Sequence, residues 1–202
     1  MDMLFGAGDR PGAVLVRHGQ TEWSRTGRHT GRTDVPLDDH GRSQAEAVGE
    51  VLAAEEFRSV LSSPLSRALD TCKLAGYGAV AEVDADLAEW DYGGYEGRTS
   101  ADIRSEVGGW SLWNDGVPGG ETIGEVSERA LRVVKRIEQS PGETLIFAHG
   151  HLLRVLAAVW AGLAPEDGRR LVLAAGSVSR LGWEHGLRAL TAWNLQTGQP
   201  RR

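Results

Sequence analysis

The sequence has a single cysteine, Cys72, among its 202 residues. One cysteine excludes an internal disulfide framework. It also excludes a zinc site built from several thiolates of one chain. A protein without disulfides suits a reducing compartment, so we expect a cytoplasmic location.

Long hydrophobic runs are also absent. The longest apolar stretches, such as residues 155–163, are far shorter than the roughly 20 residues that a membrane-spanning helix needs. Residues 1–12 contain Asp2, Asp9 and Arg10 where a signal peptide would be hydrophobic. We therefore expect no membrane association. The formal net charge of −6 argues against a nucleic-acid partner, because such proteins usually carry a basic surface.

Short apolar runs alternate with helical patterns along the chain, and a hairpin pattern closes it. The predicted strands cover residues 13–16, 59–61, 79–83 and 144–148, the predicted helices begin near 39 and at Pro64 and cover 123–137 and 152–160, and the hairpin covers 177–184 and 187–193. This order predicts a three-layer α/β/α sandwich with a mixed, mostly parallel central sheet. We expect one domain over residues 1–202, with loose termini at 1–12 and 197–202.

Polar residues suited to phosphate chemistry follow the predicted strands. His18 follows the first strand, Arg67 comes soon after the second, Glu89 after the third and His149 after the fourth. Ligands of α/β sheets collect at the carboxyl ends of the strands, so we expect these side chains to converge. Arg17 lies beside His18 and adds a second guanidinium group.

This set of side chains can transfer a phosphoryl group. Guanidinium groups match the oxygens of a phosphate, and a neutral imidazole is a competent nucleophile near pH 7. A carboxyl group in a partly apolar pocket can give a proton to a leaving oxygen. Arginines can supply the positive charge, so we expect neither a metal nor another cofactor. His149 and His151 lack a third ligand nearby for zinc.

Six motifs resemble those of the histidine phosphatase superfamily, also called phosphoglycerate mutase-like, in the order that this family shows. They are Arg17-His18-Gly19-Gln20-Thr21, Thr30-Gly31 followed by Asp34 and Leu37, Ser62-Ser63-Pro64-Leu65-Ser66-Arg67-Ala68, Leu87-Ala88-Glu89 followed by Tyr92-Gly93 and Glu96-Gly97, Pro118-Gly119-Gly120-Glu121, and Ala148-His149-Gly150. The resemblance covers roughly residues 13–185 and implies the phosphoglycerate mutase-like fold.

The resemblance also implies a role for each residue. His18 would carry the phosphoryl group, with Arg17, Arg67 and His149 around the phosphate. Glu89 would protonate the leaving oxygen and then activate water. Further contacts to a small phosphorylated substrate would come from the other matched positions, with the amides near Gly19 and Gly150 as oxyanion donors. The implied substrate-binding residues are Gly19, Ser24, Thr30, Gly31, Tyr92 and Gly150.

Two positions after the acid favour a phosphatase over a mutase. Mutases of this superfamily place Arg and His after the acid, whereas this chain has Trp90 and Asp91. A mutase must retain a bisphosphate, which favours extra cations. The residues in these motifs also resemble those of the broad-specificity acid phosphatases of actinobacteria. The alternatives are a cofactor-dependent phosphoglycerate mutase and, more remotely, a non-catalytic module that binds a phosphorylated ligand.

Some assignments stay open at this stage. Trp90, Trp110, Trp113 and His151 are candidates for the wall of the substrate pocket, because such pockets favour aromatic side chains. We interpret His29, His40 and His185 as surface residues and Glu121 as a possible cap of the helix that follows it. An exposed edge strand of the terminal hairpin is a possible homodimer contact.

Overall fold

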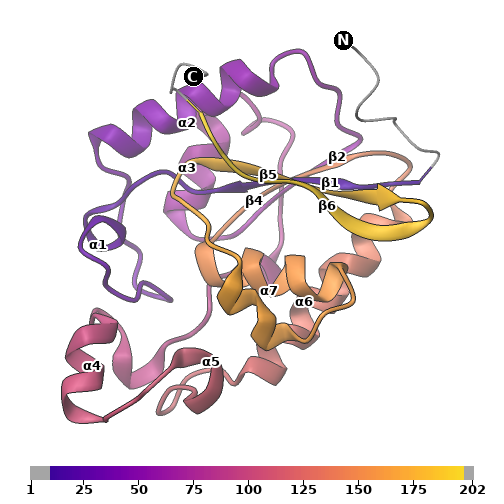
Figure 1. Ribbon diagram of the computed structural model, residues 1–202. Coiled ribbons are helices and arrows are strands. Elements are labelled where there is room, and N and C mark those ends of the chain that lie inside the picture. The colour runs from indigo at the N-terminus through magenta and orange to yellow at the C-terminus, as the bar shows by residue number, and fades with distance from the viewer. Residues whose placement is uncertain (1–9, 198–202) are drawn as a thin grey trace.

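A mixed sheet lies at the centre of the computed structural model, which describes residues 10–197 and has six strands within that range (Figure 1). The strands are β1 (Ala13–Arg17), β2 (Ser59–Ser62), β3 (Glu82–Val83), β4 (Thr144–Ala148), β5 (Ser177–Glu184) and β6 (Leu187–Gln196). Their order across the sheet is β3-β2-β4-β1-β5-β6. The first four of these are mutually parallel, and β5 is antiparallel to both of its neighbours. The predicted mixed, mostly parallel sheet is confirmed.

Helices cover both faces of the sheet. The α-helices are α1 (Glu22–Arg25), α2 (Asp39–Leu52), α3 (Ser66–Leu74), α4 (Ser100–Glu106), α5 (Leu112–Asp115), α6 (Ile123–Gln139) and α7 (Gly150–Trp160), and the 3₁₀ helices are η1 (Ala85–Leu87), η2 (Gly93–Tyr95) and η3 (Pro165–Arg170). Figure 1 shows α2 and α3 above the sheet and α6 and α7 below it, with α4 and α5 farther out at the lower left. No helix within residues 10–197 is long and apolar enough to cross a membrane.

The strand residues divide between two apolar layers because side chains alternate along a strand. Val14 and Val16 of β1 pack against α2 and α3, where they meet Val48 and Cys72. Ala13 and Leu15 of the same strand point to the other layer, which lies between the sheet and helices α6 and α7. Full burial of one such aliphatic side chain stabilises the fold by about 1.5–3 kcal/mol. Both faces of β1 are therefore anchored, which holds its carboxyl end in place.

Three local predictions need correction. The third strand is shorter than expected, because residues 79–81 form a turn and loop at the edge of the sheet and only Glu82–Val83 pairs with β2. Pro64 lies outside its helix, since α3 starts at Ser66. Glu121 is not the cap of α6. Thr122 has that role, and its side chain accepts a hydrogen bond from the Glu125 N–H.

The beginning of the described chain is less loose than we expected. Arg10 donates a hydrogen bond to the Gly186 carbonyl and stacks on Trp183, with 4.9 Å between the guanidinium carbon and the ring centroid. Trp183 donates its indole N–H to the Pro11 carbonyl at 3.0 Å. Residues 10–12 are thus attached to the terminal hairpin. The rest of the predicted loose termini, residues 1–9 and 198–202, lies outside the described residues.

Candidate active site

His18 and His149 lie side by side at one edge of the sheet. Each follows one of the two neighbouring parallel strands β1 and β4, whose last residues, Arg17 and Ala148, are paired in register. The two imidazole rings are 5.1 Å apart between centroids and are tilted by 58°. Both side chains are buried, with exposed fractions of 4% and 0%.

The His18 ring is held by its own neighbour in the chain. Its Nδ1 atom lies 2.7 Å from the carbonyl oxygen of Gly19. A carbonyl oxygen only accepts, so Nδ1 carries the proton and Nε2 keeps its lone pair. Burial lowers the pKa of His18 well below its usual value, and the nearby charges of Arg67 and Arg17 lower it further. The ring is therefore neutral and ready to act as a nucleophile through Nε2.

The His149 ring is oriented by Ser63, the residue that follows β2. Its Nε2 atom lies 2.7 Å from Oγ of Ser63. The Ser63 hydroxyl oxygen also accepts a hydrogen bond from the N–H of Leu65 at 3.3 Å. A serine oxygen that accepts this N–H can donate its own proton to Nε2, which leaves the proton of the neutral ring on Nδ1. Burial, followed by the charge of Arg67, lowers the pKa of His149 well below its usual value.

Two buried arginines are held by backbone carbonyl groups. Arg67 donates to the carbonyls of Thr33, Thr30 and Gly31 at 3.1, 2.9 and 2.9 Å. Arg17 donates from Nη1 to the carbonyl of Leu173. Burial lowers the pKa of both guanidinium groups, and the negative charge of Glu89 opposes that effect at each. The site therefore holds two positive charges in a desolvated position.

Three buried nitrogen atoms of this site have no hydrogen-bond partner within residues 10–197. They are Nε of Arg17, Nε of Arg67 and Nδ1 of His149. An unsatisfied buried polar group costs about 1–3 kcal/mol, and more when it is charged. Such groups are rare in folded proteins and call for an explanation. Together they form a set of donors that an anion would satisfy.

The carboxylate of Glu89 lies against the N-terminal end of α7. Its oxygens accept hydrogen bonds from the backbone N–H groups of Trp90 at 2.9 Å, His151 at 3.0 Å and Leu152 at 2.9 Å. The first N–H groups of a helix have no partner inside it and favour negative charge. The negative charge of Glu89 also acts to raise the pKa of both Arg17 and Arg67, which burial lowers. The carboxylate is therefore fixed at the edge of the cationic site.

The two glycines proposed as amide donors differ in their contacts. The Gly19 N–H already donates to Oγ1 of Thr71 at 3.0 Å, so the expectation that it serves as an oxyanion donor is wrong for this arrangement. Gly150 is the first residue of α7. A Cβ atom there would lie 3.3 Å from Cζ of Arg17, so the backbone passes close to that guanidinium.

Three more predicted residues follow β1, namely Ser24 in the short helix α1 and Thr30 and Gly31 in the loop after it. The Ser24 hydroxyl is used locally, since it donates to the Thr21 carbonyl at 3.0 Å and accepts from the Thr21 N–H at 2.9 Å. Thr30 and Gly31 hold Arg67 through their carbonyl oxygens, as described above. Gly31 leaves no room for a side chain, because a Cβ atom would lie 2.5 Å from the Trp90 carbonyl oxygen.

Tyr92 lies in a buried aromatic cluster next to the acid. Its hydroxyl is 2.6 Å from Nδ1 of His151, and its ring centroid is 4.7 Å from that of His29. Burial raises the pKa of Tyr92 well above its usual value, so the hydroxyl donates to His151. His29 is not a surface residue as expected. Burial lowers its pKa to about 4, because the ring lies between Tyr92 and Trp110.

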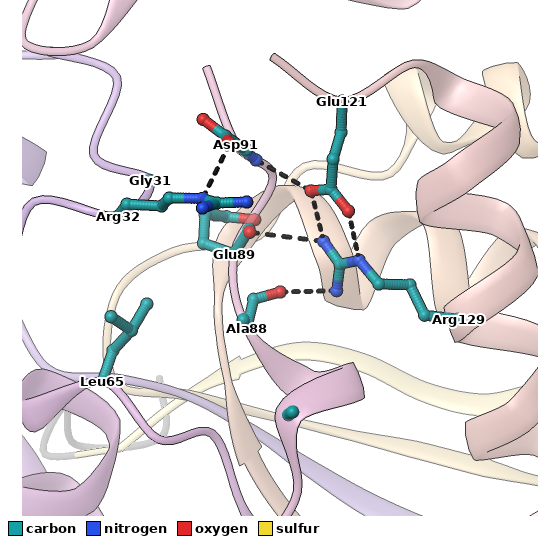
Figure 2. A pocket seen from close by; sticks show the side chains of 9 residues that line it. Gly31, Arg32, Leu65, Ala88, Glu89, Asp91, Glu121 and Arg129 are labelled. Carbon is teal, nitrogen blue, oxygen red and sulfur yellow. Dashed lines mark hydrogen bonds and ion pairs between the residues drawn. The ribbon is translucent and has the colours of Figure 1, made fainter. Parts of the chain in front are cut away.

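A hollow of about 230 Å³ opens beside residues 86–91, the segment that contains Glu89 and is called the acid loop below (Figure 2). Its lining residues are Gly31, Arg32, Leu65, Ala85, Ala88, Glu89, Asp91, Glu121 and Arg129. Arg32 crosses it and pairs with Asp91, with 2.7 Å between Nε and Oδ2. On the far side, Arg129 forms a two-pronged ion pair with Glu121. The described residues 10–197 contain no group of three or more His, Cys, Asp or Glu placed to hold a metal ion.

Comparison with known proteins decides the family. A family model described as the histidine phosphatase superfamily (branch 1) matches residues 13–196. The chain belongs to this superfamily. An acid phosphatase of Mycobacterium tuberculosis is 43% identical to it over 192 residues, covering 93% of this chain and 94% of that protein. A solved structure of the M. tuberculosis open reading frame Rv3214 has a TM-score of 0.88 and 42% identity, and covers 92% of this chain and 98% of the other.

Other relatives within the histidine phosphatase superfamily carry different activities in their names. A sedoheptulose 1,7-bisphosphatase of Saccharomyces cerevisiae is 37% identical, covering 77% of this chain and 69% of that protein. A probable phosphoglycerate mutase of Salmonella choleraesuis is 32% identical, covering 91% of this chain and 90% of that protein. The predicted family and the predicted phosphoric monoester hydrolase activity on small phosphorylated substrates are confirmed, with the mutases as relatives in the same family.

Sequence reasoning missed several residues that shape this histidine phosphatase site. Ser63 orients His149, Thr71 holds the Gly19 amide, and Arg129 with Glu121 frames the acid loop. Ser63 and Glu121 stand inside recognised motifs but had no partner assigned. Arg129 had only one signal, namely that a charged residue interrupts the otherwise apolar buried face of α6.

Proposed function

We propose that this phosphatase works through a phosphohistidine on Nε2 of His18. The observation that carries the proposal is the set of three unpartnered buried nitrogens, on Arg17, Arg67 and His149, around a neutral His18. A phosphate group has the charge and the acceptor oxygens to satisfy all three, and guanidinium groups suit it geometrically.

In the first step, the Nε2 lone pair of His18 attacks phosphorus and forms a P–N bond. The P–O bond to the organic group breaks, and the leaving oxygen keeps its electron pair and takes a proton from Glu89. Arg17, Arg67 and His149 stabilise the charge on the phosphoryl oxygens in the transition state. The buried, fixed position of each donor means that little reorganisation is needed during the reaction.

In the second step, water attacks phosphorus and displaces His18. The Glu89 carboxylate takes a proton from this water, the P–N bond breaks, and inorganic phosphate leaves. The three N–H groups that hold Glu89 suit both steps, because they fix the position of its carboxyl group beside the reacting atoms. We further propose that Tyr92, Gly31 and Gly150 contact the substrate, together with Thr30 and Ser24.

The wider biological setting is also a proposal. We propose that the chain is one domain over residues 1–202 and works in the cytoplasm without a nucleic-acid partner, in keeping with its single buried cysteine and net charge of −6. The edge strand β6 exposes Leu187 and Leu195, which suits a homodimer. Sedimentation analysis of the purified chain tests the dimer, and a monomer at all concentrations contradicts it.

The test of the nucleophile is to trap the intermediate. The enzyme is mixed with p-nitrophenyl phosphate, quenched in alkali within milliseconds, digested and analysed by mass spectrometry. We expect an acid-labile phosphoryl group on His18, and a loss of turnover of at least about 1,000-fold in His18→Asn. The matched control is His40→Asn, an exposed histidine on α2, which keeps full activity. A phosphoryl group on another residue, or activity in His18→Asn, refutes the assignment.

A mutase is the second candidate, because several relatives are named as probable phosphoglycerate mutases. Both activities start with the same phosphohistidine, and they differ in whether water or a substrate hydroxyl receives the phosphoryl group. We expect 3-phosphoglycerate to give inorganic phosphate without 2-phosphoglycerate, with or without added 2,3-bisphosphoglycerate. Fast isomerisation that depends on the bisphosphate would instead make the chain a mutase.

A further inference from the structure

Three arginines on one face of α6 bind the segment that contains Glu89. Arg129, Arg132 and Arg136 are spaced by three and four residues, so they project from the same side of the helix. Arg136 pairs with Asp84 at 2.8 Å and with Glu82 at 2.9 Å. Arg132 makes two hydrogen bonds to the Asp86 carboxylate, at 2.9 and 2.7 Å. The contacts of Arg129 are of another kind.

Arg129 binds the backbone of residues that precede Glu89 in the chain and the backbone of Glu89 itself. Its Nη1 atom donates to the carbonyl oxygens of Asp86 at 2.8 Å and Ala88 at 2.7 Å. Its Nη2 atom donates to the carbonyl oxygen of Glu89 at 3.2 Å. The two remaining N–H groups bind the Glu121 carboxylate at 2.7 and 2.9 Å. All five donors of the guanidinium group are thus used, as Figure 2 shows in part.

Glu121 connects Arg129 to the residues that follow Glu89 in the chain. Its Oε2 atom, which receives one Arg129 bond, also accepts the backbone N–H of Asp91 at 2.9 Å. Its backbone carbonyl accepts the indole N–H of Trp90 at 2.8 Å. The chain is therefore fixed immediately before and immediately after Glu89, and both restraints lead back to one residue of α6.

We propose that Arg129 is a positioning residue for Glu89, acting through the backbone of residues 86–91 and through Glu121. This inference rests on the proposed function of Glu89 as proton donor to the leaving oxygen. A misplacement of about 1 Å in a reacting group can cost about 100-fold in rate. The segment around Glu89 is irregular, so its position depends on such side-chain contacts, and Arg129 has only a small exposed fraction of 8%.

Lysine cannot replace Arg129 in this role. A lysine keeps the positive charge but has one nitrogen, which cannot reach five acceptor atoms spread over two segments. Arg129→Lys should therefore loosen the Glu89 backbone while leaving the charge in place. Arg132→Lys is the matched control. Arg132 lies one turn along the same helix and pairs with the Asp86 side chain, but within residues 10–197 it donates no hydrogen bond to the backbone of residues 86–91.

The experiment compares two substrates with different needs for a proton. p-Nitrophenyl phosphate has a leaving group that departs without protonation, whereas glycerol 3-phosphate has an alkoxide that needs it. We expect kcat/KM of Arg129→Lys to fall about 100-fold on glycerol 3-phosphate and less than about 5-fold on p-nitrophenyl phosphate. Glu121→Gln should show the same pattern with a smaller loss. Arg132→Lys should stay within about twofold on both substrates.

Glu89→Gln is measured alongside to separate the two proposals. Glu89→Gln is expected to lose more activity on glycerol 3-phosphate than on p-nitrophenyl phosphate. If it does so while Arg129→Lys and Glu121→Gln each lose kcat/KM equally on both substrates, Arg129 and Glu121 are merely structural and the inference is overturned. If neither variant loses activity on either substrate, it is overturned as well. If Glu89→Gln itself affects both substrates equally, the acid role of Glu89 fails first, and the inference falls with it. Thermal melting of each variant confirms that it is folded.

Discussion

Oγ of Ser63 and Nε2 of His149 are 2.7 Å apart although 86 positions separate the two residues in the chain. Parallel pairing of β2 with β4 brings the ends of these strands together, and the serine then fixes both the tilt and the tautomer of the imidazole. A ring held in this way keeps its proton on Nδ1, a buried atom that has no hydrogen-bond partner within residues 10–197.

Removing this hydroxyl should slow catalysis without unfolding the protein. We expect kcat of Ser63→Ala to fall about 10- to 100-fold, because the His149 ring can rotate and lose its tautomer preference. Ser63→Thr retains the hydroxyl and should retain most of the activity. The neighbouring Ser62→Ala, whose hydroxyl donates only to the Ser63 carbonyl, serves as the control. Equal kinetics in Ser63→Ala and the native enzyme would contradict the orienting role.

Gly19 should tolerate no side chain. A Cβ atom at this position would overlap the carbonyl of Gly41, at the start of α2. Overpacking of this kind costs about 1–3 kcal/mol, and here it would also displace the His18 loop. We expect Gly19→Ala to lower the urea midpoint and to abolish turnover. Gly108→Ala is the control, since a Cβ atom there meets nothing within 4 Å, and an equal effect of both changes would refute the packing argument.

Acid should destabilise the fold through its buried histidines. Burial is the first cause that lowers the pKa of His18, His29, His149 and His151. The unfolded chain takes up protons near pH 6.5 and the folded one does not, so the free energy of unfolding falls as the pH drops below that value. For His29 the fall continues to its folded pKa of about 4, at about 1.4 kcal/mol per pH unit.

Urea denaturation at pH 7.5, 6.5 and 5.5 measures this dependence. Stability should be nearly constant between the first two values and should fall clearly between the last two. His29→Asn should show a shallower fall than the native protein, whereas the exposed His40→Asn should leave the slope unchanged. A constant free energy of unfolding down to pH 5.5 would show that these histidines are protonated in the folded state.

Chelation should leave the activity unchanged. Arg17 and Arg67 supply the positive charge at the proposed phosphate position, so the expected chemistry needs no added cation. Hydrolysis of p-nitrophenyl phosphate is measured before and after dialysis against EDTA, with an EDTA-treated zinc phosphatase as the control. A loss that zinc or magnesium restores would overturn the metal-free mechanism.

The α/β alternation and the residue types that carry the chemistry can be predicted from the amino-acid sequence without the structure. Apolar runs such as residues 144–148 are buried strands because every side chain in them is apolar or small, and the polar residue that follows each strand marks the functional edge. His18, Arg67, Glu89 and His149 could be selected on that basis, together with their motifs. Periodicity failed at residues 79–81, because an edge segment can leave the sheet without losing buried contacts.

The contacts that hold these residues in place follow from the packing of the folded chain and could not be predicted from the sequence. Arg67 is fixed by carbonyl oxygens of the loop after β1, and Arg17 by that of Leu173, contacts that any residue type could provide and that no sequence motif records. The burial of His29, the pairing of Ser63 with His149 and the grip of Arg129 on the acid loop join segments far apart in the chain. Such contacts depend on how helices and strands pack, since side-chain chemistry alone does not specify which distant group lies within hydrogen-bond distance.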